Sequence, residues 1–514
     1  MGAAAKTDVP FTYKRHEPER TLAYQTVARS LESWIAERNA DTEKTCLQEF
    51  VLKDMRGFIQ CGVVAYGFVY VNCPSCPDTD LLVGLSCKRR GFCPRCGAKR
   101  QAEVTAHLID NVLPHAAYRQ FVVTFPYQLR YWMAMNSKLN NKIHKIVAGQ
   151  IMGRYERQAA QRGIASPKAG GATFIQRFGS ALNLNQHYHI VALEGVFSVV
   201  SETPRYFQIS GPTDDDVAAL VQAIADQCIA LLRRLKYLPR EGEDVVEGEL
   251  KPVAFDPEFA ESEQFLAAAA ASNALHIAFG PRAGEPVRRI GKTFGLTGDH
   301  PEIKSKRCAA VNGFSIHANR YIGAHERDKL EQLISYTTRP PFSHKRLSLK
   351  DPDNRDGDLL YELKSPWRDG TTAIQLSHAE FFEKLAALVP PPYSHTSRYF
   401  GVLSSHSEWR SRIILKPGVK KGFVAVGDGP PERMNWARLL KRTFKIDLTA
   451  CPKCKQRIYP DHVQLIDTQP EIRMVLIMLK LPPDPPPIRP PGNLPEGEDD
   501  ESFFNQEISY EVED

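Results

Sequence analysis

Long apolar runs are missing from this sequence of 514 residues. No stretch approaches the ~18 consecutive apolar residues of a membrane-spanning helix, and the first residues lack the basic, apolar and small-residue order of a signal peptide. The Gly-x-x-x-x-Gly-Lys-Ser/Thr loop of ATP-driven motors is missing, as is any internal repeat. We therefore expect a cytoplasmic protein with no membrane partner and no ATP-driven step.

The charge is unevenly distributed. The sequence has 66 Lys and Arg against 60 Asp and Glu, a net charge of +6. The tail from Glu496 to Asp514 holds nine of the acidic residues and no basic one, which leaves 66 basic against 51 acidic residues, or +15, for the rest. A basic body with an acidic tail favours a polyanionic partner such as nucleic acid over a merely solvated surface.

Six of the eleven cysteines lie close together near the N-terminus. In a cytoplasmic chain such a cluster indicates metal binding and not disulfides. Two Cys-x-x-Cys knuckles, Cys73–Cys76 and Cys93–Cys96, are separated by 16 residues, the spacing of a four-thiolate zinc site in which each knuckle supplies two sulfurs. Cys61 and Cys87 are further candidate ligands. A later knuckle, Cys451–Cys454, is either half of a second metal site or a bare turn.

Cations surround the second knuckle. Lys88, Arg89 and Arg90 precede it, and Lys99 and Arg100 follow it. The module is either a zinc-stapled fold with no partner or, as we favour, a zinc module that also contacts DNA phosphates.

Hydrophobic periodicity predicts alternating helices and strands through the rest of the chain. The expected helices are residues 21–37, 132–161, 214–238, 265–277, 325–336 and 381–388. The expected strands are residues 119–125, 173–175, 181–185, 187–191, 287–294 and 313–317. Residues 241–250 read as a loop, and the Pro-rich stretch from Pro482 reads as extended or disordered.

His187 and His189 stand two residues apart in an expected strand, so both imidazoles point to one face and can bind one ion. With 15 His in 514 residues, chance alone supplies about 0.4 such pairs, so the pair needs support from elsewhere. Tyr336 is one candidate partner. It lies at the flank of the apolar face of its helix, where a phenol either reaches a groove or covers the helix end.

Several strings between about Gly57 and Leu481 carry a family resemblance. They are Cys61-Gly, Tyr66-Gly-Phe, Ser86-Cys-Lys-Arg-Arg-Gly-Phe-Cys-Pro-Arg-Cys-Gly, Phe121-Val-Val-Thr-Phe-Pro, Asn185-Gln-His-Tyr-His, Gly313-Phe-Ser-Ile-His-Ala, Tyr336-Thr-Thr-Arg-Pro-Pro, Trp367-Arg-Asp-Gly-Thr-Thr, Leu385-Ala-Ala-Leu-Val-Pro-Pro-Pro and Arg398-Tyr-Phe-Gly-Val-Leu. In this order they resemble the rolling-circle transposases of the IS ninety-one family, within the HUH superfamily. The branch carried by insertion-sequence common-region elements is the most similar.

The resemblance implies that His187 and His189 bind a catalytic magnesium or manganese ion and that Tyr336 is the nucleophile. It implies a transposase that nicks and joins single-stranded DNA at element ends through a 5′-phosphotyrosine, acting on the nucleoid of a bacterium. Two-tyrosine members carry a second tyrosine where this chain has Gln332. Either Tyr336 is reused, or a homodimer supplies another. The alternatives are a zinc-dependent DNA-binding protein and a rolling-circle replication initiator.

Some site residues stay open. His317 and Glu194 are candidates for a third metal ligand, whereas Gln186 points away from the pair in a regular strand. Lys345 and Arg346 either contact phosphate or are simply exposed charges.

The fold class expected is a multidomain α+β protein, whose central HUH nuclease has an antiparallel sheet flanked by helices. Five regions are expected. They are a helical segment (1–50), a zinc-binding, DNA-binding module (51–110), the HUH tyrosine nuclease (111–350), a helical C-terminal region with a Cys-x-x-Cys knuckle (351–480) and a Pro-rich, acidic tail (481–514).

Overall fold

The computed structural model describes residues 15–40, 46–76, 80–239, 253–291, 306–414, 450–451 and 453–492. The expected loop at 241–250 and the acidic tail from Glu496 lie outside these residues. In the part described, the fold is α+β with antiparallel sheets, and no helix is both long and apolar enough to cross a membrane.

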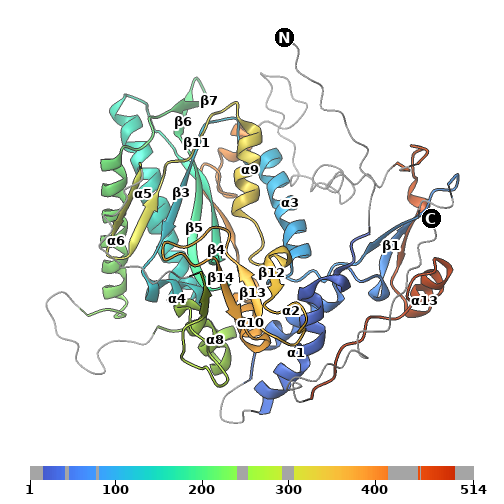
Figure 1. Ribbon diagram of the computed structural model, residues 1–514. Helices are drawn as coiled ribbons and strands as arrows, with labels where there is room; N and C mark the ends of the chain where they lie inside the picture. The colour runs from blue at the N-terminus through green and yellow to red at the C-terminus, as the bar shows by residue number, and fades with distance from the viewer. Residues whose placement is uncertain are drawn as a thin grey trace.

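A seven-stranded antiparallel sheet forms the centre of the molecule (Figure 1). Its strand order is β15-β4-β5-β3-β10-β9, and β11 pairs with β3 beyond the end of β10. The bounds are β3 Tyr118–Thr124, β4 Gly170–Phe178, β5 Leu184–Leu193, β9 Cys308–Val311, β10 Phe314–His317, β11 Tyr321–Ile322 and β15 Ser397–Gly401. We call it the central sheet.

Residues on the two faces of the central sheet alternate, as the strand period requires. On β5, Tyr188 and Ile190 pack in the apolar core beneath helices α5 and α6. Val191 and Leu193 point the other way, into a second core beneath α3 and α9. Figure 1 shows these two helix pairs on opposite sides of the sheet. The bounds are α3 Pro94–Asn111, α5 Ser137–Gln161, α6 Asp214–Arg234 and α9 Arg327–Thr337.

The helix expected over residues 132–161 is two helices, α4 (Tyr127–Met135) and α5. Asn136 between them has an extended backbone, and its side chain accepts a hydrogen bond from the Leu139 N–H, which caps the start of α5. The start of α6 is fixed by a capping box between Thr213 and Asp216. Local capping therefore sets where both long helices begin.

A second antiparallel sheet, of order β12-β13-β14-β8, adjoins the helices α10 and α1. Residues 351–480, expected to be helical, thus contribute strands to three sheets as well as helices. The bounds are β8 Arg288–Ile290, β12 Leu347–Leu349, β13 Leu359–Glu362, β14 Ala373–Leu376, α1 Leu22–Ala40, α7 Pro257–Ala260, α8 Glu263–Ala274, α10 His378–Leu388 and α11 Arg410–Ile413. A two-stranded ribbon, β6 Gly195–Val200 and β7 Thr203–Gln208, extends from β5.

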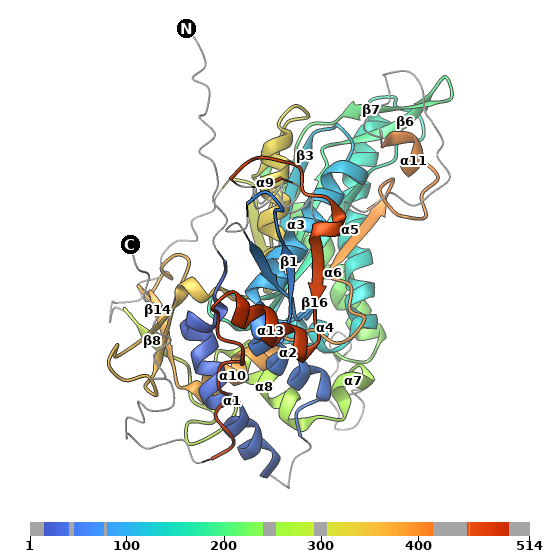
Figure 2. The ribbon, with the colours of Figure 1, turned by 90° about the vertical axis from the view of Figure 1, so that its right-hand side faces the viewer.

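The third sheet joins the two ends of the chain. Strand β16 (Val463–Ile466) pairs with β1 (Phe68–Val71), which forms a hairpin with β2 (Leu81–Gly84). Helix α13 (Gln469–Met478) follows β16, and α2 (Glu49–Gln60) precedes β1. Figure 2 shows β16 beside β1 with α13 next to them.

The Pro-rich stretch is extended as far as the described residues reach. It runs along α1, where the Arg489 N–H donates to the Ala28 carbonyl at 3.0 Å. A proline-rich segment cannot form a helix of its own, so packing against α1 fixes its path.

Candidate active site

Two imidazoles converge on β5. The Nε2 atoms of His187 and His189 are 3.2 Å apart. Nδ1 of His187 lies 2.8 Å from the Asn185 carbonyl oxygen, and Nδ1 of His189 lies 2.9 Å from the side-chain nitrogen of Gln120. A metal-bound histidine donates its second ring N–H to an oxygen, as Nδ1 of His187 does here to the Asn185 carbonyl. His189 takes the same tautomer when the Gln120 amide presents its oxygen to Nδ1. Both Nε2 atoms are directed at one place.

The charge state of the pair also fits a metal. Burial lowers the pKa of His187 to about 4 and the pKa of His189 to about 3, and the nearby Arg339 guanidinium adds to both effects. The rings are therefore neutral at neutral pH, which is the form that binds a metal. Two nitrogens that bind one ion at about 2.1 Å from neighbouring corners lie about 3.0–3.4 Å apart. The observed separation is in this range, so the pair fits a divalent ion.

Tyr336 lies against the His pair. Its ring centroid is 6.1 Å from that of His189, with the two rings perpendicular. The residue is 37% exposed, while Leu333 and Ile334 of the same helix are fully buried against the sheet. α9 covers the sheet face to which the histidines point, and its flank carries the phenol to them. The hydroxyl is therefore accessible to a bulky substrate.

Two cations that sequence reasoning missed surround the phenol. The Arg339 guanidinium carbon is 4.1 Å from the centre of the Tyr336 ring, and the Lys364 ammonium is 4.3 Å from it. Arg339 also donates to the Tyr336 carbonyl at 3.2 Å. Lys364 lies two residues after the end of β13, far from Tyr336 in the sequence, so no local pattern relates the two residues. Positive charge thus lies where an anionic substrate would approach the hydroxyl.

Two glutamine side chains hold the backbone on either side of Tyr336. Gln101 of α3 donates to the Ser335 carbonyl at 2.7 Å, and its nitrogen lies 2.8 Å from the Ser335 hydroxyl oxygen. Gln176 of β4 donates to the Thr337 carbonyl at 2.7 Å. The phenol is thereby fixed both to the sheet and to the helix that follows the second knuckle.

Gln176 has a further property relevant to a metal. It is directly across from His187 in the β4–β5 register, so the two side chains share a face. The residue is only 3% exposed, and its Oε1 atom is buried without a hydrogen-bond partner. A buried carbonyl oxygen without a partner is costly unless a donor or cation meets it. Its position near the end of a mostly buried strand, directly after Phe174 and Ile175, was the signal that sequence reasoning overlooked.

The candidates for a third ligand lie elsewhere. His317 shares the sheet face of His189, but Val122 lies between them in the register. The His317 side chain is exposed. Glu194 is buried in an ion pair with Arg119. Among the described residues, no third His, Cys, Asp or Glu groups with the pair.

Gln186 points to the opposite face from the His pair, as expected. Its side chain donates to Asn140 of α5 at 3.0 Å.

Two groups of four thiols stand apart from the His pair. The α3 thiol group lies at the start of α3, and the hairpin thiol group lies beyond the end of β1. Within each group the sulfurs are all within 4.8 Å of one another. The α3 thiol group is Cys61, Cys87, Cys93 and Cys96. The hairpin thiol group is Cys73, Cys76, Cys451 and Cys454.

This grouping corrects the expectation that Cys73–Cys76 and Cys93–Cys96 together form one site. The β1–β2 hairpin holds the two knuckles at different places, because β2 and residues 85–92 carry the chain back from the hairpin to the start of α3. Cys61 and Cys87 complete the group around the second knuckle, and Cys451–Cys454 completes the first. In the α3 thiol group the Cys61 sulfur lies 3.6 Å from the Cys96 sulfur and 3.4 Å from the Cys93 sulfur. Four sulfurs at about 2.3 Å from a tetrahedral zinc would be about 3.8 Å apart.

Two family models match the chain. One, described as "Transposase zinc-binding domain" of the IS ninety-one type, covers residues 31–125, and the other, described as "Putative transposase", covers residues 170–410. Together they include the α3 thiol group, the His pair and Tyr336. The chain belongs to the IS ninety-one family of transposases. No curated protein and no solved structure matches it.

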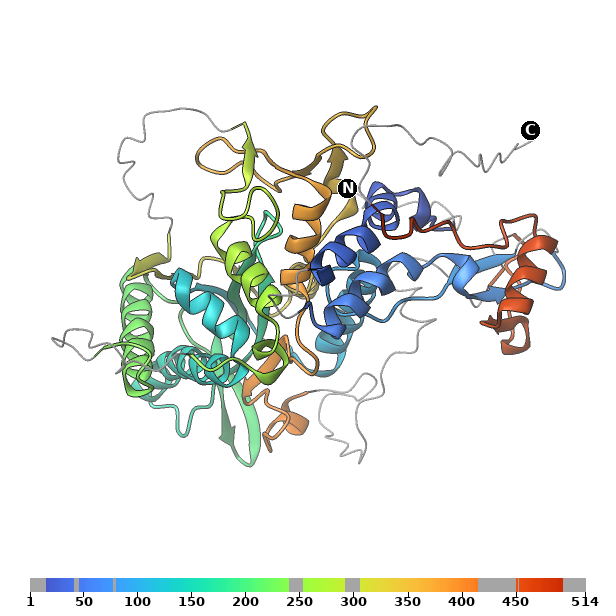
Figure 3. The same cartoon turned by 90° about the horizontal axis from the view of Figure 1, so that it is seen from below.

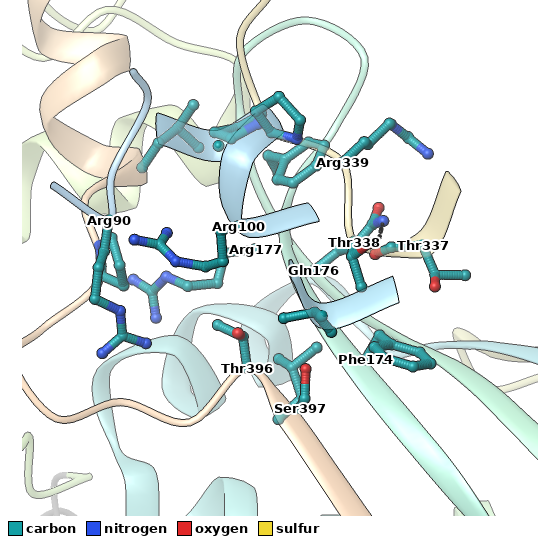
Figure 4. Close-up of a pocket in the computed structure, with 18 of the residues that line it drawn as sticks. Arg90, Arg100, Phe174, Gln176, Arg177, Thr337, Thr338, Arg339, Thr396 and Ser397 are labelled. Atoms are coloured by element: carbon teal, nitrogen blue, oxygen red, sulfur yellow. Dashed lines mark hydrogen bonds between the residues drawn. The ribbon is translucent and has the colours of Figure 1, made fainter. Parts of the chain in front are cut away.

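A transposase acts on DNA, and this transposase has a basic pocket beside its tyrosine. Figure 4 shows Arg90, Arg100 and Arg177 on one side of the pocket and Gln176 and Thr338 on the other. Burial, with Arg100 close by, lowers the pKa of Arg90, and burial lowers the pKa of Arg177 to about 10. Arg90 and Arg100 carry like charges that repel each other, so an anion between them would be attracted.

The basic residues expected to contact DNA in the transposase are in different situations. Lys88 and Lys345 are exposed and line one groove between the zinc-binding domain and the segment after Tyr336. Arg90 lies at the basic pocket. Arg89 packs its side chain against Gly57 of α2.

Arg346 of the transposase is already engaged. It donates to the carbonyls of Glu362 at 2.6 Å and Ser180 at 2.9 Å, and its guanidinium packs on the Tyr361 ring. These contacts favour a structural role over phosphate binding.

The thiol groups and the family match support structural zinc in the transposase. Thiolate is the ligand that zinc prefers for closed, four-coordinate sites. The α3 thiol group lies in the matched zinc-binding domain, and its Cys93 is the residue directly before the first turn of α3. Zinc bound there would fix the start of the helix whose Gln101 holds the backbone beside Tyr336.

Proposed function

We propose that this transposase nicks and joins single-stranded DNA at the ends of its element through a 5′-phosphotyrosine on Tyr336, and so drives rolling-circle transposition in the bacterial cytoplasm. The observation that carries the proposal is that the Tyr336 phenol lies beside two convergent, neutral imidazoles on one face of the central sheet. A nucleophile and a metal-binding pair within reach of one phosphate are what in-line attack requires.

The reaction is a phosphoryl transfer with no net loss of bonds. The Tyr336 oxygen bonds to phosphorus while the bond from phosphorus to the 3′ oxygen breaks. The phenol proton passes to solvent, and the 3′ oxygen takes up a proton to become a free hydroxyl. Attack by a 3′ hydroxyl on the phosphotyrosine reverses the exchange and releases the phenol, so joining needs no ATP.

His187, His189 and the Oε1 atom of Gln176 are the ligands we propose for a catalytic magnesium or manganese ion. When bound, the ion supplies positive charge to the non-bridging oxygens of the scissile phosphate. Arg339 and Lys364 stabilise the same developing negative charge from the side of the phenol, because both lie within about one van der Waals contact of its ring.

The basic pocket suits a phosphate next to the scissile one. Its arginines come from the zinc-binding domain (Arg90, Arg100) and from β4 (Arg177), so one strand of DNA can contact both parts of the protein. Such contacts fix the position of the strand without reading its sequence.

A single tyrosine must serve both transfers, or a homodimer must supply another. Gln332 is exposed one helical turn before Tyr336, where the two-tyrosine members have their second nucleophile. An amide cannot replace a phenol as a nucleophile. We propose that Tyr336 is reused after the first joining step.

The proposal is tested with the full-length protein and single-stranded oligonucleotides that tile the ends of the element, in magnesium or manganese. A covalent protein–DNA band on a denaturing gel is expected, and Tyr336→Phe should abolish it. Tyr393→Phe is the matched control, because Tyr393 is 89% exposed and lies outside the site. A covalent band that survives Tyr336→Phe excludes the proposed nucleophile.

A further inference from the structure

The hairpin thiol group joins parts of the chain that are far apart in sequence. Its members Cys73 and Cys454 are separated by 381 positions, yet their sulfurs are 3.7 Å apart. Neither family model extends to Cys451 or Cys454. The match to a zinc-binding domain therefore does not account for this group.

The separation of the sulfurs fits coordination and not a disulfide. A disulfide requires sulfurs about 2.05 Å apart, and none of the four cysteines is disulfide-bonded. Ligands of one tetrahedral zinc are about 3.8 Å apart, close to the 3.7 Å observed. Cys73, Cys76 and Cys451 are buried, whereas Cys454 is exposed, so the group lies at the surface with one open side.

Each half of the group is a tight turn. In the first, the Cys76 N–H donates to the Cys73 carbonyl at 3.0 Å. In the second, the Lys455 N–H donates to the Cys451 carbonyl at 3.0 Å, and Lys455 has a φ of 61°. Such turns direct two sulfurs of a Cys-x-x-Cys knuckle to the same side, and here two knuckles face each other.

The surrounding structure holds the two knuckles together. Residues 463–466 of β16 pair with all four residues of β1, next to the hairpin. Ile458 packs with Val71 and Leu81 around the buried cysteines. Figure 3 shows β1 and α13 together at one end of the molecule, with α6 at the other end. The group is therefore a preformed site between two segments that also pair through β16 and β1 and pack together through α13.

We propose that the hairpin thiol group binds a second structural zinc ion, which fastens the C-terminal segment 450–481 to the zinc-binding domain. The ion bonds to two sulfurs from each segment. The ion thereby links β16 to the β1–β2 hairpin. Leu465 of β16 and Asp467, just after it, line the groove beside the segment that follows Tyr336. The proposal does not depend on the nuclease chemistry.

The test is the zinc content of the purified full-length protein, measured by inductively coupled plasma mass spectrometry. His189→Ala is used as the background, so that the His pair cannot add zinc to the count. The expected count is two zinc ions per chain. Cys73→Ser/Cys76→Ser and Cys451→Ser/Cys454→Ser should each leave one, and the quadruple variant should also leave one, because both pairs serve the same ion. Cys46→Ser, at an exposed thiol outside both groups, should leave two.

A count of one in the background protein, or of none in the quadruple variant, overturns the proposal. Alkylation of the unsubstituted protein gives an answer that needs no variant to fold. With zinc bound, Cys454 should react with N-ethylmaleimide at least tenfold more slowly than Cys46, although both are exposed. A chelator should remove the difference. Equal rates in the zinc-bound protein contradict a metal at this group.

Discussion

The central sheet and the zinc-binding region bring side chains together over very different distances along the chain. In the sheet, His187 and His189 are two residues apart, and the strand period alone directs them to one face. In the hairpin thiol group, the sulfurs that meet are 381 positions apart. Short spacing thus correctly predicted that the two imidazoles share a face, whereas the same kind of spacing argument grouped the cysteines incorrectly.

The largest effect should come from His187 and His189, the proposed metal ligands, where sequence spacing was informative. His189→Ala removes one of the two convergent nitrogens, and we expect DNA cleavage in manganese to fall on the order of 10³-fold, because a transition-state interaction is lost. Cleavage of a single-stranded end oligonucleotide measures this.

His317→Ala is the control for the His pair. The residue has the same side chain on the same sheet face but is exposed and separated from His189 by Val122. Its cleavage rate should stay within a few-fold of the unsubstituted protein. If instead the loss matches that of His189→Ala, the proposed ligand set is wrong.

Gln176 tests the part of the site that depends on pairing between strands. Gln176→Ala removes the proposed third ligand and the hydrogen bond to Thr337, and a loss of roughly 10–100-fold is expected. Gln176→Glu keeps an oxygen ligand, so it should recover most of the rate at saturating manganese. Titration of manganese in both variants gives the apparent affinity. Equal affinity in Gln176→Ala and the unsubstituted protein would assign Gln176 to positioning alone.

Gln101 connects the two regions compared above. Gln101→Ala removes the contacts of α3 with Ser335, which are worth about 1–2 kcal/mol, so we expect cleavage to fall roughly 10-fold with little change in DNA affinity. Single-turnover kinetics separate the two quantities. Gln332→Ala, at an exposed position of α9, is the matched control and should leave the rate unchanged. A fall in affinity with an unchanged rate would remove Gln101 from the positioning of Tyr336.

Arg346 should show the smallest effect on chemistry. Arg346→Ala loses two hydrogen bonds to carbonyls and the packing on Tyr361, so stability should fall by about 1–3 kcal/mol while cleavage at low temperature stays within twofold. Lys345→Ala, at the exposed neighbouring residue, should change stability by less than about 0.5 kcal/mol. Thermal unfolding of both variants gives the difference. A cleavage defect in Arg346→Ala without loss of stability would restore its expected role at phosphate.

What the sequence could predict follows from the range of the interactions. Periodicity located most of α1, α5, α6, α8, α9 and α10, and it put Tyr336 at the flank of α9, because a helix fixes its own faces. It did not locate α2 or α3. It did not find Gln101, Gln176 or Lys364, whose roles arise only when α3, β4 and the residues after β13 pack around the tyrosine. The helix boundary at Asn136 was missed because the apolar pattern continues from α4 into α5. Only the capping hydrogen bond of the Asn136 side chain marks the break.

The cysteines illustrate the same limit. Spacing identifies a knuckle, since the turn is local, but which knuckles meet is decided by the hairpin and by the pairing of β16 with β1. In the same way, β15 belongs to the region after residue 350 but pairs with β4 at the edge of the central sheet. Such pairings have no signature in a single sequence.

The most direct test of the account is to locate the covalent bond itself. The unsubstituted transposase is incubated with a single-stranded end oligonucleotide in manganese, digested with nuclease and protease, and analysed by mass spectrometry. The account predicts that the 5′-phosphate of the cleaved strand is attached to the peptide that contains Tyr336. Attachment to any other tyrosine, or cleavage with no attached nucleotide, would contradict it.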